Sequence, residues 1–183
     1  MYLRGTIFWG FARMNLRLRL ALLARLGLAG LALLGAAAAW AGETSGLPLP
    51  RFVSLRSDEV NLRTGPGVRY PIDWIYARKD LPVEVIAEFE AWRKIRDWQG
   101  TEGWVHQSML TGRRMMVVMG QARSLRSSDA ESSDPVAVVE AGVLGRIVQC
   151  PRNRDYCRVE IDKTQGWMRR DEIWGVYKGE WIE

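Results

Sequence analysis

Two short motifs occur twice at the same spacing, and this internal repeat constrains the fold more than any other feature of the sequence. Asn61-Leu62-Arg63 is followed by Gly103-Trp104-Val105, with 42 residues from the leucine to the tryptophan. Ser124-Leu125-Arg126 and Gly166-Trp167-Met168 repeat the pattern at the same distance, so the period is 63 residues. A period of this length, shared by two motifs, predicts two small domains of one fold in tandem.

Apolar residues that alternate with polar ones predict that both domains are all-β. The segment 83–90 places glutamates on most of one face, as expected for a half-buried strand. The other face of this strand comprises Val83, Val85, Ala87 and Phe89. Ile72, Trp74 and Tyr76 alternate in the same way. Short strands separated by turns such as Thr64-Gly65-Pro66-Gly67 are typical of small barrels or sandwiches.

The N-terminal segment 1–41 has the features of a secretory signal peptide. Five arginines and no acidic residue precede or border an apolar run, Leu26 to Ala39, and Ala39-Trp40-Ala41 offers small side chains at the two positions that a signal peptidase recognises. We therefore expect cleavage near Ala41 and a periplasmic or secreted protein. The alternative is an uncleaved membrane anchor formed by the longer run from Leu20 to Ala41, although Arg25 interrupts that longer run. Met14 is an alternative start of the chain.

The net charge of the chain, +5, lies entirely in this segment. The chain has 26 Lys and Arg against 21 Asp and Glu, and five of the basic residues precede Ala41. The remainder therefore balances 21 basic against 21 acidic residues. Binding to nucleic-acid phosphates needs several basic groups on one face, and no such stripe is evident, so nucleic acid is not an expected partner.

The two cysteines, Cys150 and Cys157, are separated by six residues. In an oxidising compartment such a pair indicates a disulfide that closes a hairpin, and the alternative is two free buried thiols. An eight-residue loop closed in this way stabilises the fold by about 2.5 kcal/mol through loop-closure entropy.

The stretch Val60–Gly67, followed by Tyr70-Pro71 and later by Gly103-Trp104-Val105-His106, resembles a bacterial SH3-like domain. The segment 92–98 is similar to the central strand of the subgroup found in exported proteobacterial proteins. The resemblance covers 51–114 well, whereas the second copy is degenerate and has Ser127-Ser128-Asp129-Ala130 in place of the Thr-Gly-Pro-Gly turn. It implies barrels of five or six strands, a ligand groove beside the loop from Thr64 to Tyr70, and the binding of cell-wall peptides or protein partners.

Aromatic and arginine side chains near that loop are the candidate ligand-binding residues, because they suit peptides and carboxylates. They are Arg63, Tyr70, Trp74, Tyr76 and Trp98. The alternative is that most of these aromatic residues form the core of a small barrel. We expect Arg96 and Asp97 to form a structural ion pair.

Catalysis and metal binding are not expected. The sequence has one histidine, His106, which directly follows the Gly-Trp-Val strand and is expected to be structural or solvated. No paired histidine motif for a metal can therefore form, and we expect no cofactor.

The sequence thus predicts an all-β protein with two tandem SH3-like barrels and no enzymatic activity. Its expected parts are a signal peptide (1–41), a short linker (42–50), a first domain (51–114) and a degenerate second domain (115–183). The expected function is recognition of a peptidoglycan peptide or an envelope protein. The alternatives are a periplasmic interaction protein with no wall ligand and, least favoured, a hydrolase. A membrane would be engaged only through an uncleaved signal segment.

Overall fold

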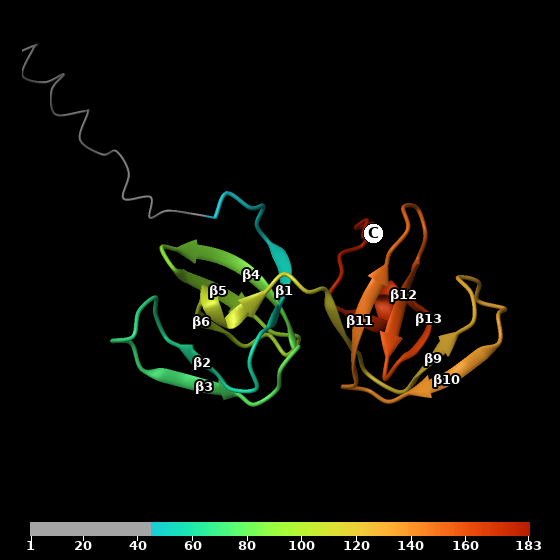
Figure 1. The fold of residues 1–183 in the computed structure, drawn as a ribbon, viewed down its shortest axis with the longest axis horizontal. Helices are drawn as coiled ribbons and strands as arrows, with labels where there is room; N and C mark the ends of the chain where they lie inside the picture. Colours follow the sequence, from blue (N-terminus) through green and yellow to red (C-terminus); the bar gives the residue numbers. More distant parts are fainter. Residues whose placement is uncertain (1–44) are drawn as a thin grey trace, which may run out of the picture. The chain divides into compact units, whose positions relative to one another are not determined.

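The computed structural model describes residues 45–183, which form two seven-stranded antiparallel sheets one after the other along the chain (Figure 1). The predicted signal peptide lies outside the described residues. Within residues 45–183, no helix has the length and apolar character that a bilayer span requires. The prediction of an all-β fold with two tandem domains is confirmed.

The first sheet has the strand order β3-β2-β6-β5-β4-β1-β7. Its strands are β1 (Arg51–Leu55), β2 (Val60–Arg63), β3 (Ile72–Tyr76), β4 (Pro82–Phe89), β5 (Trp92–Arg96), β6 (Glu102–His106) and β7 (Leu110–Thr111), with the 3₁₀ turn η1 (Gln107–Met109) before β7. Hairpins join β2 to β3, β4 to β5 and β5 to β6. The first strand, β1, lies between β4 and β7 and pairs with both. The strand β3 is therefore an edge of the sheet.

The second sheet repeats this order as β10-β9-β13-β12-β11-β8-β14. Its strands are β8 (Met115–Val118), β9 (Arg123–Arg126), β10 (Pro135–Val139), β11 (Leu144–Gln149), β12 (Tyr156–Ile161), β13 (Thr164–Arg169) and β14 (Ile173–Trp174), with the 3₁₀ turn η2 (Arg170–Glu172) before β14. Each sheet thus has seven strands, one or two more than the five or six expected, because the last strand of each is a two-residue piece after the 3₁₀ turn.

The repeated motifs owe their spacing to one strand pairing in each barrel. Arg63 pairs with Trp104 between β2 and β6, and Arg126 pairs with Trp167 between β9 and β13. The leucine before each arginine is fully buried and packs onto the glycine before each tryptophan. A β-carbon on Gly103 would lie 2.5 Å from Cγ of Leu62, so the glycine is required for this close approach.

Each barrel has its own apolar core, built from the inward faces of the strands. The first core includes Leu62, Val83, Val85 and Ile95, and the second includes Leu125, Val159 and Met168. Alternation along β4 is interrupted by a register shift between Val85 and Ala87, so the prediction that Phe89 shares the buried face of Val85 is wrong. A bulge moves the following side chains to the other face, and the side chain of Phe89 is exposed.

The two barrels lie in one compact unit of the chain and contact each other directly. The ring of Phe52 in β1 lies 4.7 Å from the ring of Trp174 and 4.6 Å from that of Tyr177, between ring centroids. The hydroxyl of Tyr177 donates a hydrogen bond of 2.7 Å to the buried carboxylate of Glu84. Glu84 is therefore buried against the second barrel, whereas the alternation of the sequence predicted an exposed glutamate.

Cys150 and Cys157 form a disulfide, as predicted, and it links the ends of the hairpin between β11 and β12. Both cysteines are fully buried in the second core. The backbone of Cys150 also pairs with that of Ile182, which attaches the C-terminal segment to the second barrel.

Candidate functional site

The loop between β2 and β3 is held in place by Arg63, one of the predicted ligand-binding residues. Its Nη1 donates to the carbonyl oxygen of Tyr70 at 2.8 Å and to that of Val68 at 3.1 Å. The ring of Tyr70 lies so close to Gly65 that a β-carbon there would collide with it. The glycine of this turn therefore allows the ring to fold back onto the loop, and Arg63 holds the loop through its hydrogen bonds.

The strand that follows this loop exposes large apolar side chains at the edge of the sheet. The exposed fractions are 45% for Ile72, 55% for Trp74 and 50% for Ile75, and Val68 in the loop is 79% exposed. The outer backbone groups of an edge strand have no partner strand in the sheet, so an extended chain can pair with them. The β2–β3 hairpin thus combines free backbone groups with an apolar surface, the two features by which a sheet binds an extended peptide.

The remaining predicted ligand-binding residues, Tyr76 at the end of β3 and Trp98, are packing residues. Tyr76 is buried and its hydroxyl donates to Asp97 at 3.0 Å; burial first, and then the negative charge of Asp97, raise the pKa of this tyrosine above its ordinary value. Trp98 is half-buried and packs against the first core. The structure therefore brings Arg63, Tyr70 and Trp74 together on one hairpin, and it places Tyr76 and Trp98 with the packing residues.

The predicted ion pair between Arg96 and Asp97 does not form. Arg96 instead donates to Glu84 at 2.6 Å, and Asp97 accepts hydrogen bonds from the backbone N–H groups of Gln99 and Thr101. The reason is that Arg96 is the last residue of β5 and faces outward, whereas the next residue points inward towards Tyr76.

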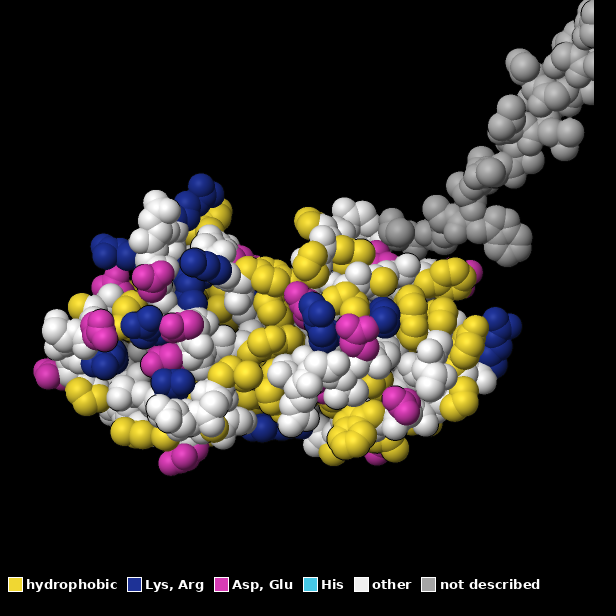
Figure 2. Space-filling model, turned by 180° about the vertical axis from the view of Figure 1, so that it is seen from behind, with side chains coloured by type: hydrophobic (Ala, Val, Ile, Leu, Met, Phe, Trp, Pro, Cys, Tyr) yellow, Lys and Arg dark blue, Asp and Glu magenta, His cyan; other side chains and the backbone are white. Residues whose placement is uncertain are grey.

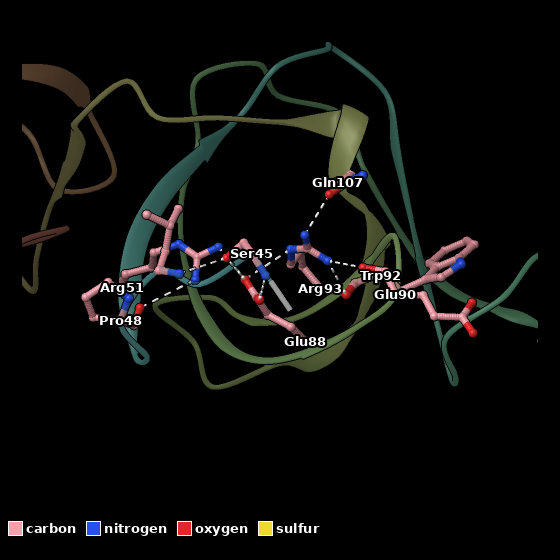
Figure 3. Close-up of polar contacts among 9 residues, drawn as sticks. Ser45, Pro48, Arg51, Glu88, Glu90, Trp92, Arg93 and Gln107 are labelled. Atoms are coloured by element: carbon pink, nitrogen blue, oxygen red, sulfur yellow. Dashed lines mark hydrogen bonds and ion pairs between the residues drawn. The ribbon is translucent and has the colours of Figure 1, made fainter. Parts of the chain in front are cut away.

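A polar cluster that the sequence analysis missed attaches the segment before β1 to the first barrel (Figure 3). The carboxylate of Glu88 is almost completely buried and accepts hydrogen bonds from the backbone N–H and hydroxyl of Ser45, both at 2.7 Å. Arg51 and Arg93 contact the same carboxylate at 2.6 and 3.2 Å. Burial alone would raise the pKa of Glu88, but the donors from Ser45 and Arg51 outweigh it and lower the pKa to about 2.

This cluster has the chemistry of an anchor. A carboxylate held ionised by two guanidinium groups has no proton to give at neutral pH. Cys157 of the second barrel is equivalent to Arg93 of the first. The residue before Arg93 pairs with the last residue of β6, and the residue before Cys157 pairs with the last residue of β13. The first barrel thus has an ion pair at the hairpin position where the second has its disulfide. No local signal in the sequence connects residues as distant as Ser45 and Glu88.

His106 lies at the end of β6 and begins the turn η1. Its Nδ1 is 2.7 Å from the hydroxyl of Ser108, and its ring meets that of Trp92 edge-on at 5.5 Å between centroids. Within the part of the chain that the structure describes, no group of three or more His, Cys, Asp and Glu residues is arranged to hold a metal ion. The local role of His106 is therefore to order a surface turn.

Comparisons with known proteins bear on the fold and on the family. The comparison with curated proteins finds no match. NlpC1 from Trichomonas vaginalis is similar in structure with a TM-score of 0.33 and 14% identity, over 79% of this chain and 51% of that one. NlpC2 from the same organism has a TM-score of 0.32 and 14% identity, over 73% and 50%. The chain thus spans about half the length of these two proteins, and likeness at this level carries no functional argument.

The sequence itself matches one family twice, once in each barrel. Residues 56–112 and 124–175 both match the bacterial SH3 domain, and together they cover more than half of the chain. The second match includes the copy whose glycine turn is replaced. Domains of this family typically serve as binding or interaction modules, so the family sets a coarse function. The chain belongs to the bacterial SH3 domain family and carries two copies of that domain.

Proposed function

We propose that this chain is an exported, non-catalytic recognition protein that binds an extended peptide segment at the β2–β3 hairpin of its first barrel. The family supports a binding or interaction role in general. The finer proposal depends on one observation, the exposed apolar edge strand with Trp74 at its centre. Soluble proteins usually protect such edges with charges or proline, and this strand carries a single charge, Asp73, among its exposed apolar side chains.

The second barrel supports this assignment by contrast. Its equivalent edge strand, β10, exposes Val136 and Val138. At the position of Trp74 it carries Ala137, because Ala137 pairs with Leu125 as Trp74 pairs with Leu62. The apolar surface of the first hairpin is therefore larger and includes an aromatic face, which suits a ligand side chain. We assign the recognition of an extended peptide to the first barrel.

The export that we propose supports a ligand of the cell envelope. The basic, apolar and small-residue pattern of 1–41 supports export to the periplasm, with cleavage near Ala41. In that compartment the extended peptides available are the stem peptides of the cell wall and exposed segments of envelope proteins. We favour the wall peptide, and the second candidate is an envelope protein, which the same edge strand would pair with.

Retention on purified sacculi separates these two candidates. The wild-type protein should sediment with sacculi, and Trp74→Ala should reduce retention at least fivefold because it removes the largest exposed side chain of the hairpin. The matched control is Val138→Ala on the equivalent strand of the second barrel, which should leave retention unchanged. Trp98→Ala is a poorer test, because Trp98 packs against the core and its loss would also destabilise the barrel.

The outcomes are distinct. No retention of the wild-type protein would refute the wall ligand and favour the protein partner, whereas equal loss in both variants would refute the assignment to the first hairpin. Release of soluble fragments from labelled sacculi by the purified protein, abolished by none of these variants, would overturn the proposal that the chain is not an enzyme.

A further inference from the structure

A pocket of about 240 Å³ in the second barrel is lined by charged residues of both signs. Its walls come from β9, from the loop after it, from the facing ends of β12 and β13, and from η2. The lining residues are Arg123, Arg126, Glu131, Tyr156, Arg169, Asp171 and Glu172. A second pocket of about 310 Å³, called the adjoining groove below, shares Arg169 and Asp171 with it. Figure 2 shows acidic and basic side chains mixed over the visible face of this barrel.

Two buried donors of this pocket have no hydrogen-bond partner. They are the hydroxyl of Tyr156 and Nε of Arg123, and they are two of the three such atoms among residues 45–183. The hydroxyl itself is buried, and Tyr156 as a whole is only 8% exposed. A buried polar group without a partner destabilises a fold, and most folds therefore contain few of them. Two in one pocket indicate that the pocket is completed by a group with acceptor oxygens.

The charges around the pocket favour a group with a single negative charge. Three arginines face three carboxylates, and two pairs are formed: Arg169 contacts Asp171 at 3.0 Å and Arg123 contacts Glu172 at 3.6 Å. Arg126 donates through Nη1 to the carbonyl of Ser133, which leaves other N–H groups of its guanidinium available. A phosphate dianion would meet three nearby carboxylates, whereas a carboxylate brings less charge and two acceptor oxygens.

A side chain above the buried donors must move for a ligand to reach them. Arg169 is the residue directly opposite Tyr156 on the neighbouring strand, and its side chain is 40% exposed. It donates to both carboxylate oxygens of Asp171, from Nε and Nη2 at 3.0 Å each, and Asp171 is itself 66% exposed. Arg169 lines both pockets, and its exposed position leaves it room to move aside when a ligand enters.

The first barrel has a different chemistry at the equivalent positions. Trp92 occupies the position of Tyr156, and its strand partner His106 occupies that of Arg169. The buried Val60 occupies the position of Arg123. Only the arginine at the end of the second strand, Arg63 or Arg126, is common to both barrels. The cluster of donors is therefore specific to the second barrel and does not follow from the fold alone.

We propose that the second barrel binds the terminal carboxylate of a peptide in this pocket, with the Tyr156 hydroxyl, Arg123 and Arg126 as donors, while the preceding residues lie along the adjoining groove. The site is distinct from the hairpin of the first barrel and does not depend on the function proposed for it. The adjoining groove favours a peptide over an isolated small anion, because it would hold the rest of the ligand.

Calorimetric titration of the complete chain tests this proposal with three probes: the tripeptide acetyl-Ala-Ala-Ala as the free acid, the same tripeptide as its C-terminal amide, and inorganic phosphate. The free acid should bind at least tenfold more tightly than the other two. Tyr156→Phe should weaken its binding about tenfold, the value expected for a hydrogen bond to a charged group. Arg123→Gln should do the same. The control is Arg158→Gln, which replaces an exposed arginine outside the pocket and should leave binding unchanged.

Thermal unfolding provides a second readout that a merely structural tyrosine would not give. Tyr156→Phe should leave the melting temperature equal or raise it, because the variant removes a buried hydroxyl that has no partner. Weaker binding together with an undiminished melting temperature supports the proposal. Equal binding of acid and amide, equal binding of acid by wild type and Tyr156→Phe, absence of binding by the wild type, or a clear loss of stability in Tyr156→Phe each overturns it.

Discussion

Gly103→Ala tests whether the repeated Gly-Trp motif exists for close packing. The added β-carbon would lie 2.5 Å from Cγ and 2.9 Å from Cδ1 of Leu62, and 2.9 Å from the carbonyl oxygen of Arg63. Leu62 is fully buried, and the carbonyl belongs to the strand that pairs with β6, so neither neighbour moves without disturbing the sheet. Overpacking of this kind costs about 1–3 kcal/mol of the free energy of unfolding.

For a barrel of this size, that loss corresponds to a fall in melting temperature of roughly 5–20 °C. Thermal unfolding followed by far-UV circular dichroism measures it. The matched control is Gly112→Ala, because Gly112 has no atom within 4 Å of the added β-carbon. That variant should be neutral or slightly stabilising, since it restricts only the unfolded chain. A Gly103→Ala protein as stable as the Gly112→Ala protein would refute the packing explanation of the repeat.

Two further predictions concern the disulfide of the second barrel and the Glu88 ion pair of the first, which lie at equivalent hairpin positions. Reduction of the Cys150–Cys157 disulfide should lower the stability of the second barrel by about 2.5 kcal/mol, the loop-closure value, and denaturant unfolding with and without a reductant measures this; an unchanged midpoint would contradict it. The folded-state pKa of Glu88 is lowered from 4.5 to about 2, so the stability it contributes is present above pH 4.5 and is lost as the pH falls towards 2. Glu88→Gln should therefore flatten the fall in unfolding free energy over that range, whereas Glu59→Gln at an exposed position should not; identical acid profiles for the two variants would contradict the role given to Glu88.

The two copies of the domain have diverged in chemistry while keeping their strand order. The first exposes an apolar edge and anchors its N-terminal segment through an ion pair, and the second has a disulfide and a charged pocket. Because each core is built from the inward faces of the strands, the outward residues of the hairpins are free to vary. We infer that each barrel binds its own ligand, and the variants above test the two sites separately.

The sequence predicted several features because local patterns encode them. The disulfide followed from two cysteines and a turn between them, and the tandem of β-domains followed from the period of 63 residues and the alternation of apolar side chains. The bulge after Val85 was not predictable, because the register of β4 depends on its pairing with β5. The same is true of Glu84, which is buried and accepts a hydrogen bond from Tyr177 of the other barrel.

The candidate site was predicted in part. The glycine turn and the aromatic residues around it directed attention to the β2–β3 hairpin, where we propose the site, but the spacing of Tyr76 could not distinguish a core residue from an exposed one. Trp98 packs inward for the same reason. The bond from Tyr76 to Asp97 joins residues 21 positions apart, and the contact of Ser45 with Glu88 joins residues 43 apart.

The sequence by itself therefore determined the class of fold, the duplication, the family and the covalent link, since each depends on residue types at short or repeated spacings. Only the tertiary structure decided which arginines hold loops, which carboxylates are buried, and which surfaces remain open to a ligand. The physical reason is that burial and hydrogen-bond partners are set by strands that are distant in the chain, and no local pattern records which of them will meet.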